Sequence, residues 1–168
     1  MTWLPFDLHP EYPPEGIRRD ELRRRYGAGV DEHQRQMFER SGQPFSPAET
    51  IPNSRDALRV TELARDRGLH EQVHDRLMDA FWGEGRNLAD RDELRALAVE
   101  AGLDVAEVDE VLESDVYLER VLASTREAQS IGINGIPAFL LDGKLLVLGA
   151  HPRETFERAF EQLGVAPA

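Results

Sequence analysis

The sequence has 168 residues, a formal net charge of −12 and no cysteine. Its length suits one domain, or a small core with an inserted subdomain. The negative charge argues against nucleic acid as a partner, because phosphate backbones attract clustered Lys and Arg. No apolar run approaches the roughly 20 residues of a membrane span. The N-terminus lacks the basic and apolar regions of a secretory signal, so we expect a cytoplasmic protein without a membrane segment.

The first half of the chain begins with an apolar segment and continues with helical patterns. Residues 2–8 alternate and are rich in apolar and aromatic side chains, which predicts a short strand. Prolines in residues 9–16 predict an irregular connection, because they fix φ and remove backbone donors. Helices are expected over 18–26, 30–40, 54–67 with Ser54 as its N-cap, and 69–82, and a proline-rich loop over 42–52.

The second half keeps the helical period for three more helices and then changes to a strand pattern. Asp90 with Glu93, and Asp104 with Glu107, have the spacing of capping boxes at two helix starts. Asp142-Gly143 is typical of a two-residue hairpin turn between two short apolar runs. The elements expected are helices over 91–101, 105–113 and 115–130, strands over 137–141 and 145–148, and a last helix ending near 163.

The most informative stretch covers residues 132–143, with the sequence GINGIPAFLLDG. A long expected helix leads into it, Pro137 begins a strand, and a tight hairpin and a final helix follow. One interpretation is purely structural, because a proline suits the start of an edge strand, where no amide donor is needed. The order of the neighbouring elements favours a second interpretation, in which this stretch has a functional role.

In this order the residues resemble the second half of a thioredoxin fold, in the DsbA-like family with a helical insertion. Four further segments resemble its FrnE-like branch: residues 3–10, 52–59, 81–88 and 148–152. The second of them is shared with 2-hydroxychromene-2-carboxylate isomerases, which use this fold with glutathione. The resemblance implies an α/β, thioredoxin-like (DsbA-like) fold that is predominantly helical. It also implies a thioredoxin-like portion over 1–17 and 115–168, with a helical insertion over 18–114.

The resemblance further implies where a substrate binds. In this family the proline is cis and lies beside the redox cysteines, and the residue before it faces the substrate. The segment Asn53–Arg55 would lie near a thiol or glutathione ligand, although a loop followed by a helix N-cap explains the same residues without a function. The substrate-binding residues implied are Gly135, Ile136, Pro137, Asn53, Ser54 and Arg55.

The function implied is that of a DsbA-like, FrnE-like thiol–disulfide oxidoreductase. Its substrate would be a protein or a small thiol or disulfide such as glutathione. Because the sequence has no cysteine, we expect this chain to be inactive as a dithiol enzyme alone, and we assign it no catalytic residue, metal or cofactor. Two alternatives stay open: a glutathione-dependent isomerase or transferase, and a non-catalytic peptide-binding module. A homodimer is also left open.

The sequence departs from the family pattern at its front. Family members begin with a strand and a C-x-x-C motif at a helix start, and only then reach the strand expected here at residues 2–8. Loss of that first strand would expose unpaired backbone groups on its neighbours. Three explanations are open: a gene start assigned too late, which we favour, a truncated chain that rearranges or pairs with a partner strand, and a degenerate paralogue.

One further motif points to metal chemistry. Residues 70–74, HEQVH, match the H-E-x-x-H signature of zinc proteases, in which two histidines share one helix face. The charged Asp75 and Arg76 follow at once, where such motifs usually stay apolar, and no third ligand stands out. We therefore expect a solvated helix face at His70 and His74 and no metal site.

Overall fold

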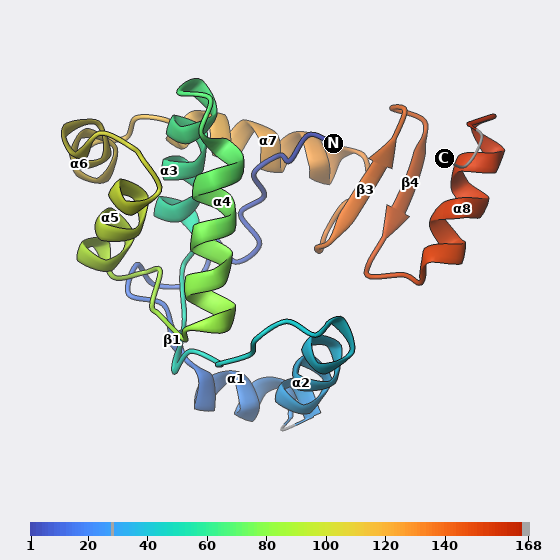
Figure 1. Cartoon of the computed structure of the whole chain (residues 1–168), viewed down its shortest axis with the longest axis horizontal. Helices are drawn as coiled ribbons and strands as arrows, with labels where there is room; N and C mark the ends of the chain where they lie inside the picture. Colours follow the sequence, from blue (N-terminus) through green and yellow to red (C-terminus); the bar gives the residue numbers. More distant parts are fainter. Residues whose placement is uncertain (28, 166–168) are drawn as a thin grey trace. The chain divides into compact units, whose positions relative to one another are not determined.

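The computed structural model describes residues 1–27 and 29–165 (Figure 1). The chain forms two compact units, one over residues 1–125 and one from residue 126 onward. The predicted division into a thioredoxin-like portion and a helical insertion, at residues 17 and 115, stays a prediction. The last three residues of the thioredoxin-like portion, 166–168, lie outside the described residues. Within the described ranges, no helix combines the length and the apolarity needed to cross a membrane.

Short helices dominate the chain. Its elements in order are β1 Ile17–Arg18, α1 Arg19–Tyr26, α2 Gly29–Ser41, β2 Thr50–Ile51, α3 Arg55–Asp66, α4 His70–Met78, the π-helical turn η1 Asp79–Gly83, α5 Arg91–Glu100, α6 Val105–Glu113, α7 Leu118–Ser130, β3 Ala138–Leu141, β4 Leu145–Leu148 and α8 Arg153–Gln162. The expected helix over 69–82 is therefore α4 followed by a π-helical turn.

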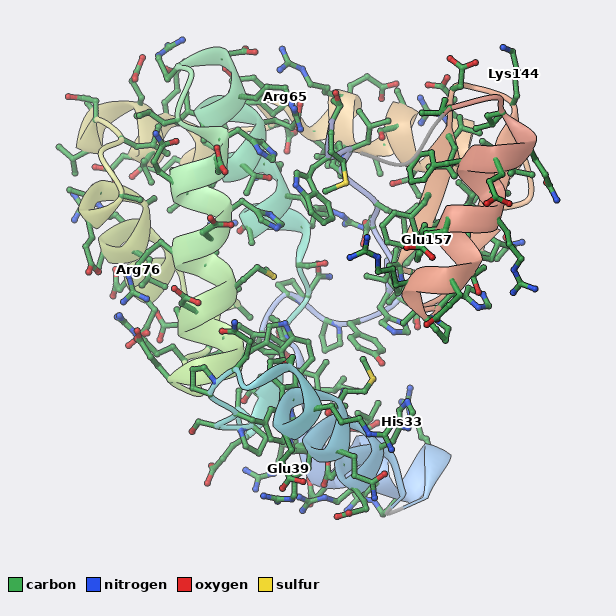
Figure 2. All side chains as sticks on the ribbon, turned by 45° about the vertical axis from the view of Figure 1, so that its right-hand side comes forward. His33, Glu39, Arg65, Arg76, Lys144 and Glu157 are labelled. Atoms are coloured by element: carbon green, nitrogen blue, oxygen red, sulfur yellow. The ribbon has the colours of Figure 1, made fainter. Side chains whose placement is uncertain are left out.

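The core of the first unit lies among α3, α4, α5 and α6 (Figure 1). Apolar residues three or four positions apart share one face of a helix, and those faces meet here. The largest fully buried apolar side chains of these four helices are Val60, Val73, Leu77, Leu94, Leu97, Val108 and Val111. Charged side chains project outward, among them Arg76 of α4, which pairs with Glu84 and Glu100 (Figure 2).

Of the three predicted N-cap residues, Asp90 and Asp104 are confirmed by side-chain cap hydrogen bonds. The carboxylate of Asp90 accepts hydrogen bonds from the amides of Asp92 and Glu93 at the start of α5. The carboxylate of Asp104 does the same at the start of α6. Each cap satisfies amide donors that have no partner inside the helix, which is a local requirement that the sequence alone reveals.

The strand predicted over residues 2–8 is wrong, because these residues form no strand in the structure. Side chains hold the segment instead of a sheet ladder. Thr125 Oγ1 accepts from the amide of Asp7 at 2.9 Å, and Ser124 Oγ donates to the carbonyl of Pro5 at 2.7 Å. Pro5 and Asp7 are buried. The buried residues of the segment are therefore Pro5 and the charged Asp7, whereas the apolar Trp3 and Leu4 are exposed, so its sequence pattern marks neither a strand nor an apolar face.

A short antiparallel pair between β1 and β2 was not predicted. Ile17 pairs with Ile51, and Arg18 with Thr50. Two-residue strands are too short to show an alternating pattern, so the sequence gives no signal for them. The pair matters because β2 leads within four residues to the start of α3.

The second unit contains the β3–β4 hairpin and α8. The hairpin pairs Ala138 with Leu148 and Leu141 with Leu145, which leaves three connecting residues rather than the two predicted. Asp142 and Gly143 have φ of 51° and 65°, and Lys144 donates its amide to the carbonyl of Leu141 at 3.0 Å. The ring of Phe139 in β3 meets that of Phe156 in α8 edge-on, with centroids 4.9 Å apart.

Candidate functional site

The first predicted site segment, Gly135–Pro137, directly precedes β3. The Ile136–Pro137 peptide bond is cis. Pro137 accepts a hydrogen bond on its carbonyl from the amide of Gly149, at 2.7 Å, just beyond β4. The β3–β4 pairing begins at Ala138, so Ile136 lies outside the ladder, and it is 58% exposed. The start of β3 therefore presents the exposed apolar side chain of Ile136 beside the exposed Pro137.

The second predicted site segment, Asn53–Arg55, begins α3. Asn53 is buried, donates from Nδ2 to the carbonyl of Tyr12 at 2.7 Å, and accepts on Oδ1 from the amide of Arg55 at 3.0 Å. Ser54 stands at the predicted N-cap position, but its hydroxyl makes no cap hydrogen bond. Asn53 therefore satisfies the first amide of the helix, and the Ser54 hydroxyl stays available to other groups.

Asp7 fixes the side chain of Arg55, and sequence reasoning missed this role. Its Oδ2 accepts from Nε and Nη2 of Arg55, both at 2.9 Å, while the carboxylate is almost fully buried. A charge-assisted contact of this kind orients a guanidinium strongly. The only sequence signal was one acidic residue inside an apolar segment, which does not identify a partner 48 positions away.

The six predicted binding residues fall into two groups. Asn53, Ser54 and Arg55 belong to the first unit, and Gly135, Ile136 and Pro137 belong to the second. The structure organises each group within its own unit. That these six residues bind substrate stays a prediction.

The H-E-x-x-H motif lies at the start of α4 and is occupied by other contacts. Arg65 donates to Nε2 of His70 at 3.0 Å, and the His74 ring stacks on Trp3 with centroids 5.2 Å apart. Burial lowers the pKa of His70, and the charges of Arg65 and His74 lower it further. A guanidinium at a ring nitrogen disfavours a metal cation there. In the described part of the chain, no cluster of three or more His, Cys, Asp or Glu could hold a metal.

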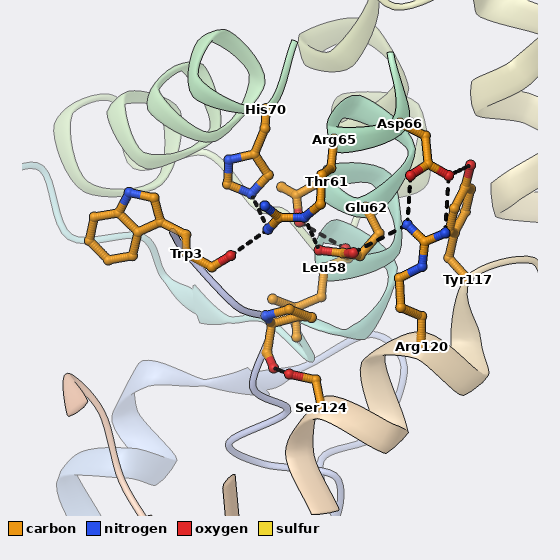
Figure 3. A network of polar contacts seen from close by, with 11 residues as sticks. Trp3, Leu58, Thr61, Glu62, Arg65, Asp66, His70, Tyr117, Arg120 and Ser124 are labelled. Carbon is orange, nitrogen blue, oxygen red and sulfur yellow. Dashed lines mark hydrogen bonds and ion pairs between the residues drawn. The ribbon is translucent and has the colours of Figure 1, made fainter. Parts of the chain in front are cut away.

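A polar network joins α3, α4, α7 and the N-terminal segment (Figure 3). The buried Glu62 carboxylate accepts from Arg65 at 3.1 Å and from Arg120 at 3.4 Å. Arg120 also donates to Asp66 at 2.8 Å, and this hydrogen bond is the main cause that lowers the pKa of Asp66. Arg65 further donates to the carbonyl of Trp3. The network explains how α3 holds the segment before Asp7 without a strand.

Comparisons with known proteins agree with this architecture. The family model described as "DSBA-like thioredoxin domain" matches residues 1–161. The chain belongs to the DsbA-like thioredoxin family. The predicted fold class, α/β with a helical insertion, is thereby confirmed.

Two individual relatives of this DsbA-like chain are informative. The crystal structure of the probable DsbA oxidoreductase SCO1869 from Streptomyces coelicolor superposes with a TM-score of 0.85 at 31% identity, covering 97% of this chain and 75% of that one. The uncharacterized protein YwbO of Bacillus subtilis is 26% identical over 170 residues, covering 95% of this chain and 80% of the relative. The present DsbA-like chain differs from a dithiol enzyme in that none of its 168 residues is a cysteine.

Proposed function

We propose that this DsbA-like chain supplies the substrate-binding surface of a FrnE-like thiol–disulfide oxidoreductase. In this proposal the exposed start of β3 receives an extended polypeptide or a small disulfide. The observation that carries it is Ile136, which lies outside the β3–β4 ladder and is 58% exposed. Extended peptides recognise such sites through backbone pairing, with an apolar side chain beside it.

The chemical step requires a thiolate. Exchange proceeds by attack of a thiolate on a disulfide sulfur through a mixed disulfide. The 168 residues contain no cysteine, so they bind and orient but do not exchange. We therefore place the binding surface in this chain and the thiol outside these residues.

We expect the purified chain to show no disulfide reductase turnover in a dithiothreitol-coupled insulin assay. The reason is that no residue can form a mixed disulfide. The control is the same preparation after treatment with a thiol-alkylating reagent, which should leave the signal at background. Turnover that survives mass-verified purification would contradict the proposal.

Substitution Ile136→Arg should weaken binding of a carboxymethylated, fluorescein-labelled unfolded polypeptide about tenfold, because truncating or charging an apolar anchor costs roughly that much. Fluorescence anisotropy measures the affinity. Val99→Arg is the matched control, because Val99 is also an exposed apolar residue, at 40%, and lies on α5. Equal weakening by both variants, or by neither, would show that the start of β3 is not the binding surface.

A glutathione-dependent isomerase or transferase is a second candidate, favoured by the start of α3. Arg55 is fixed there by Asp7 and Asn53, and the Ser54 hydroxyl is not used as a cap. S-methylglutathione is the probe, because it carries the carboxylates without a reactive thiol. Saturable binding that Arg55→Gln weakens and Ile136→Arg does not would favour this candidate over polypeptide binding.

A further inference from the structure

A small pocket lies in the first unit, at the end of α4. Its volume is about 180 Å³ and its lining includes Phe38, Gln43, Pro44, Met78, Asp79 and Trp82. Pockets for drug-sized ligands have roughly 300–1,000 Å³. This pocket therefore suits a single short chain rather than a large cofactor.

The pocket lies where α4 passes into a π-helical turn, because Asp79, Trp82 and Gly83 of η1 contribute to its lining. In η1 the hydrogen-bonded ring is one residue wider than in an α-helix, and such turns occur frequently at functional sites. The amide of Ser46 donates to the carbonyl of Trp82 at 2.7 Å, which ties the loop after α2 to this turn. A Cβ atom at Gly83 would lie 3.3 Å from Cγ of Pro44, so the loop packs closely against it.

Aromatic rings form one wall of the pocket. The rings of Phe38 and Trp82 have centroids 5.3 Å apart, and Phe45 stacks on Phe38 with centroids 4.9 Å apart. Trp82 packs against the helical core, and it also lines the pocket. Met78, at 37% exposure, adds an apolar side chain at the rim. An apolar stem in the pocket would contact Phe38, Met78 and Trp82, which line it.

One carboxylate at this pocket is free to bind a cation. Asp79 is exposed and lines the pocket, and within the described ranges its side chain has no ion-pair or hydrogen-bond partner. The basic neighbour Arg76 is already engaged by Glu84 and Glu100. The chain itself places a cation on this aromatic cluster, because Arg35 lies 6.0 Å from the centroid of Phe45.

We propose that this pocket binds an organic cation with a short apolar stem, a primary alkylammonium being the simplest example. The stem lies against Phe38, Met78 and Trp82, and the ammonium lies between the Asp79 carboxylate and the Trp82 ring. Trp rings attract cations within about 6 Å of their centroid, and a neighbouring carboxylate adds a charge-assisted hydrogen bond. This binding activity goes beyond the proposed thiol–disulfide function and does not depend on it.

The test uses tryptophan fluorescence. The sequence has two tryptophans, so the variant Trp3→Phe leaves Trp82 as the sole reporter. This variant is titrated with n-hexylamine, which is protonated at pH 7, and with n-hexanol, which has the same stem but no charge. We expect a saturable change with both and about a tenfold preference for the ammonium, the size expected of one cation–π contact plus one exposed ion pair.

Asp79→Asn in the Trp3→Phe background should reduce that preference to the share of the cation–π contact with Trp82, about threefold, and leave the affinity for n-hexanol unchanged. Asp75→Asn is the matched control, because Asp75 is an exposed carboxylate on α4 that does not line the pocket, and it should keep the preference. Equal affinity for the two probes, or equal losses in both variants, would overturn the proposal. A blocked Gly-Lys-Gly peptide is the last probe. If it binds more tightly than n-hexylamine, a lysine side chain is the source of the cation. If it binds more weakly, the source is a free amine.

Discussion

Replacing Arg59 with Ala should lower the free energy of unfolding by about 3–5 kcal/mol, the cost of breaking a buried charged network. Arg59 is 4% exposed. It donates to the carbonyls of Val111 and Ser114 and, at 2.9 Å, to that of Val116. These carbonyls surround the end of α6, where the helix lacks internal donors and a cation is favourable. Truncation leaves all three acceptors without their donor.

Arg91→Ala is the matched control for Arg59→Ala. Arg59 and Arg91 donate to the two oxygens of the same carboxylate, Asp56, at 2.8 and 2.9 Å. The side chain of Arg91 is 59% exposed and donates to no carbonyl in the part of the chain that the structure describes, so its loss should cost less than about 1 kcal/mol. Urea unfolding followed by circular dichroism gives both values. Similar small losses would mean that Arg59 contributes only its ion pair with Asp56.

Gly16→Ala should destabilise the first unit by more than about 2 kcal/mol, because positive φ and a steric clash act together. Gly16 has a φ of +82°, and a Cβ atom there would lie 2.4 Å from the carbonyl oxygen of Ile51. It would also lie 3.0 Å from Cα of Pro52. Both obstacles are backbone atoms, so the β2 segment that leads into Asn53 would have to shift.

Gly68→Ala separates the clash from the backbone strain. Gly68 has a φ of +72°, but a Cβ atom there would meet nothing within 4 Å. Its substitution should cost only the left-handed conformation, about 1–2 kcal/mol. Urea unfolding measures the difference between the two variants. If Gly16→Ala and Gly68→Ala cost the same, the backbone around Ile51 yields at little cost, and the start of α3 is less rigid than its contacts indicate.

The candidate site was only partly accessible from the sequence. The segments around Pro137 and Asn53 were identified by resemblance, and the structure places one before β3 and the other at the start of α3. Asp7, which orients Arg55, was missed because no local pattern links residues so far apart in the chain. The separate pocket lined by Asp79 was not predicted either, because it forms between the end of α4 and the distant loop after α2.

Features that depend on contacts within a few residues were determined by the sequence itself. The caps at Asp90 and Asp104 are of this kind, because donor and acceptor are two or three positions apart. Tertiary structure decided the features that depend on distant partners. Residues 2–8 have the alternation of a strand, yet they form side-chain hydrogen bonds to Ser124 and Thr125 rather than a ladder. A strand exists only when a second strand supplies its hydrogen bonds, and no pattern within seven residues can provide that information.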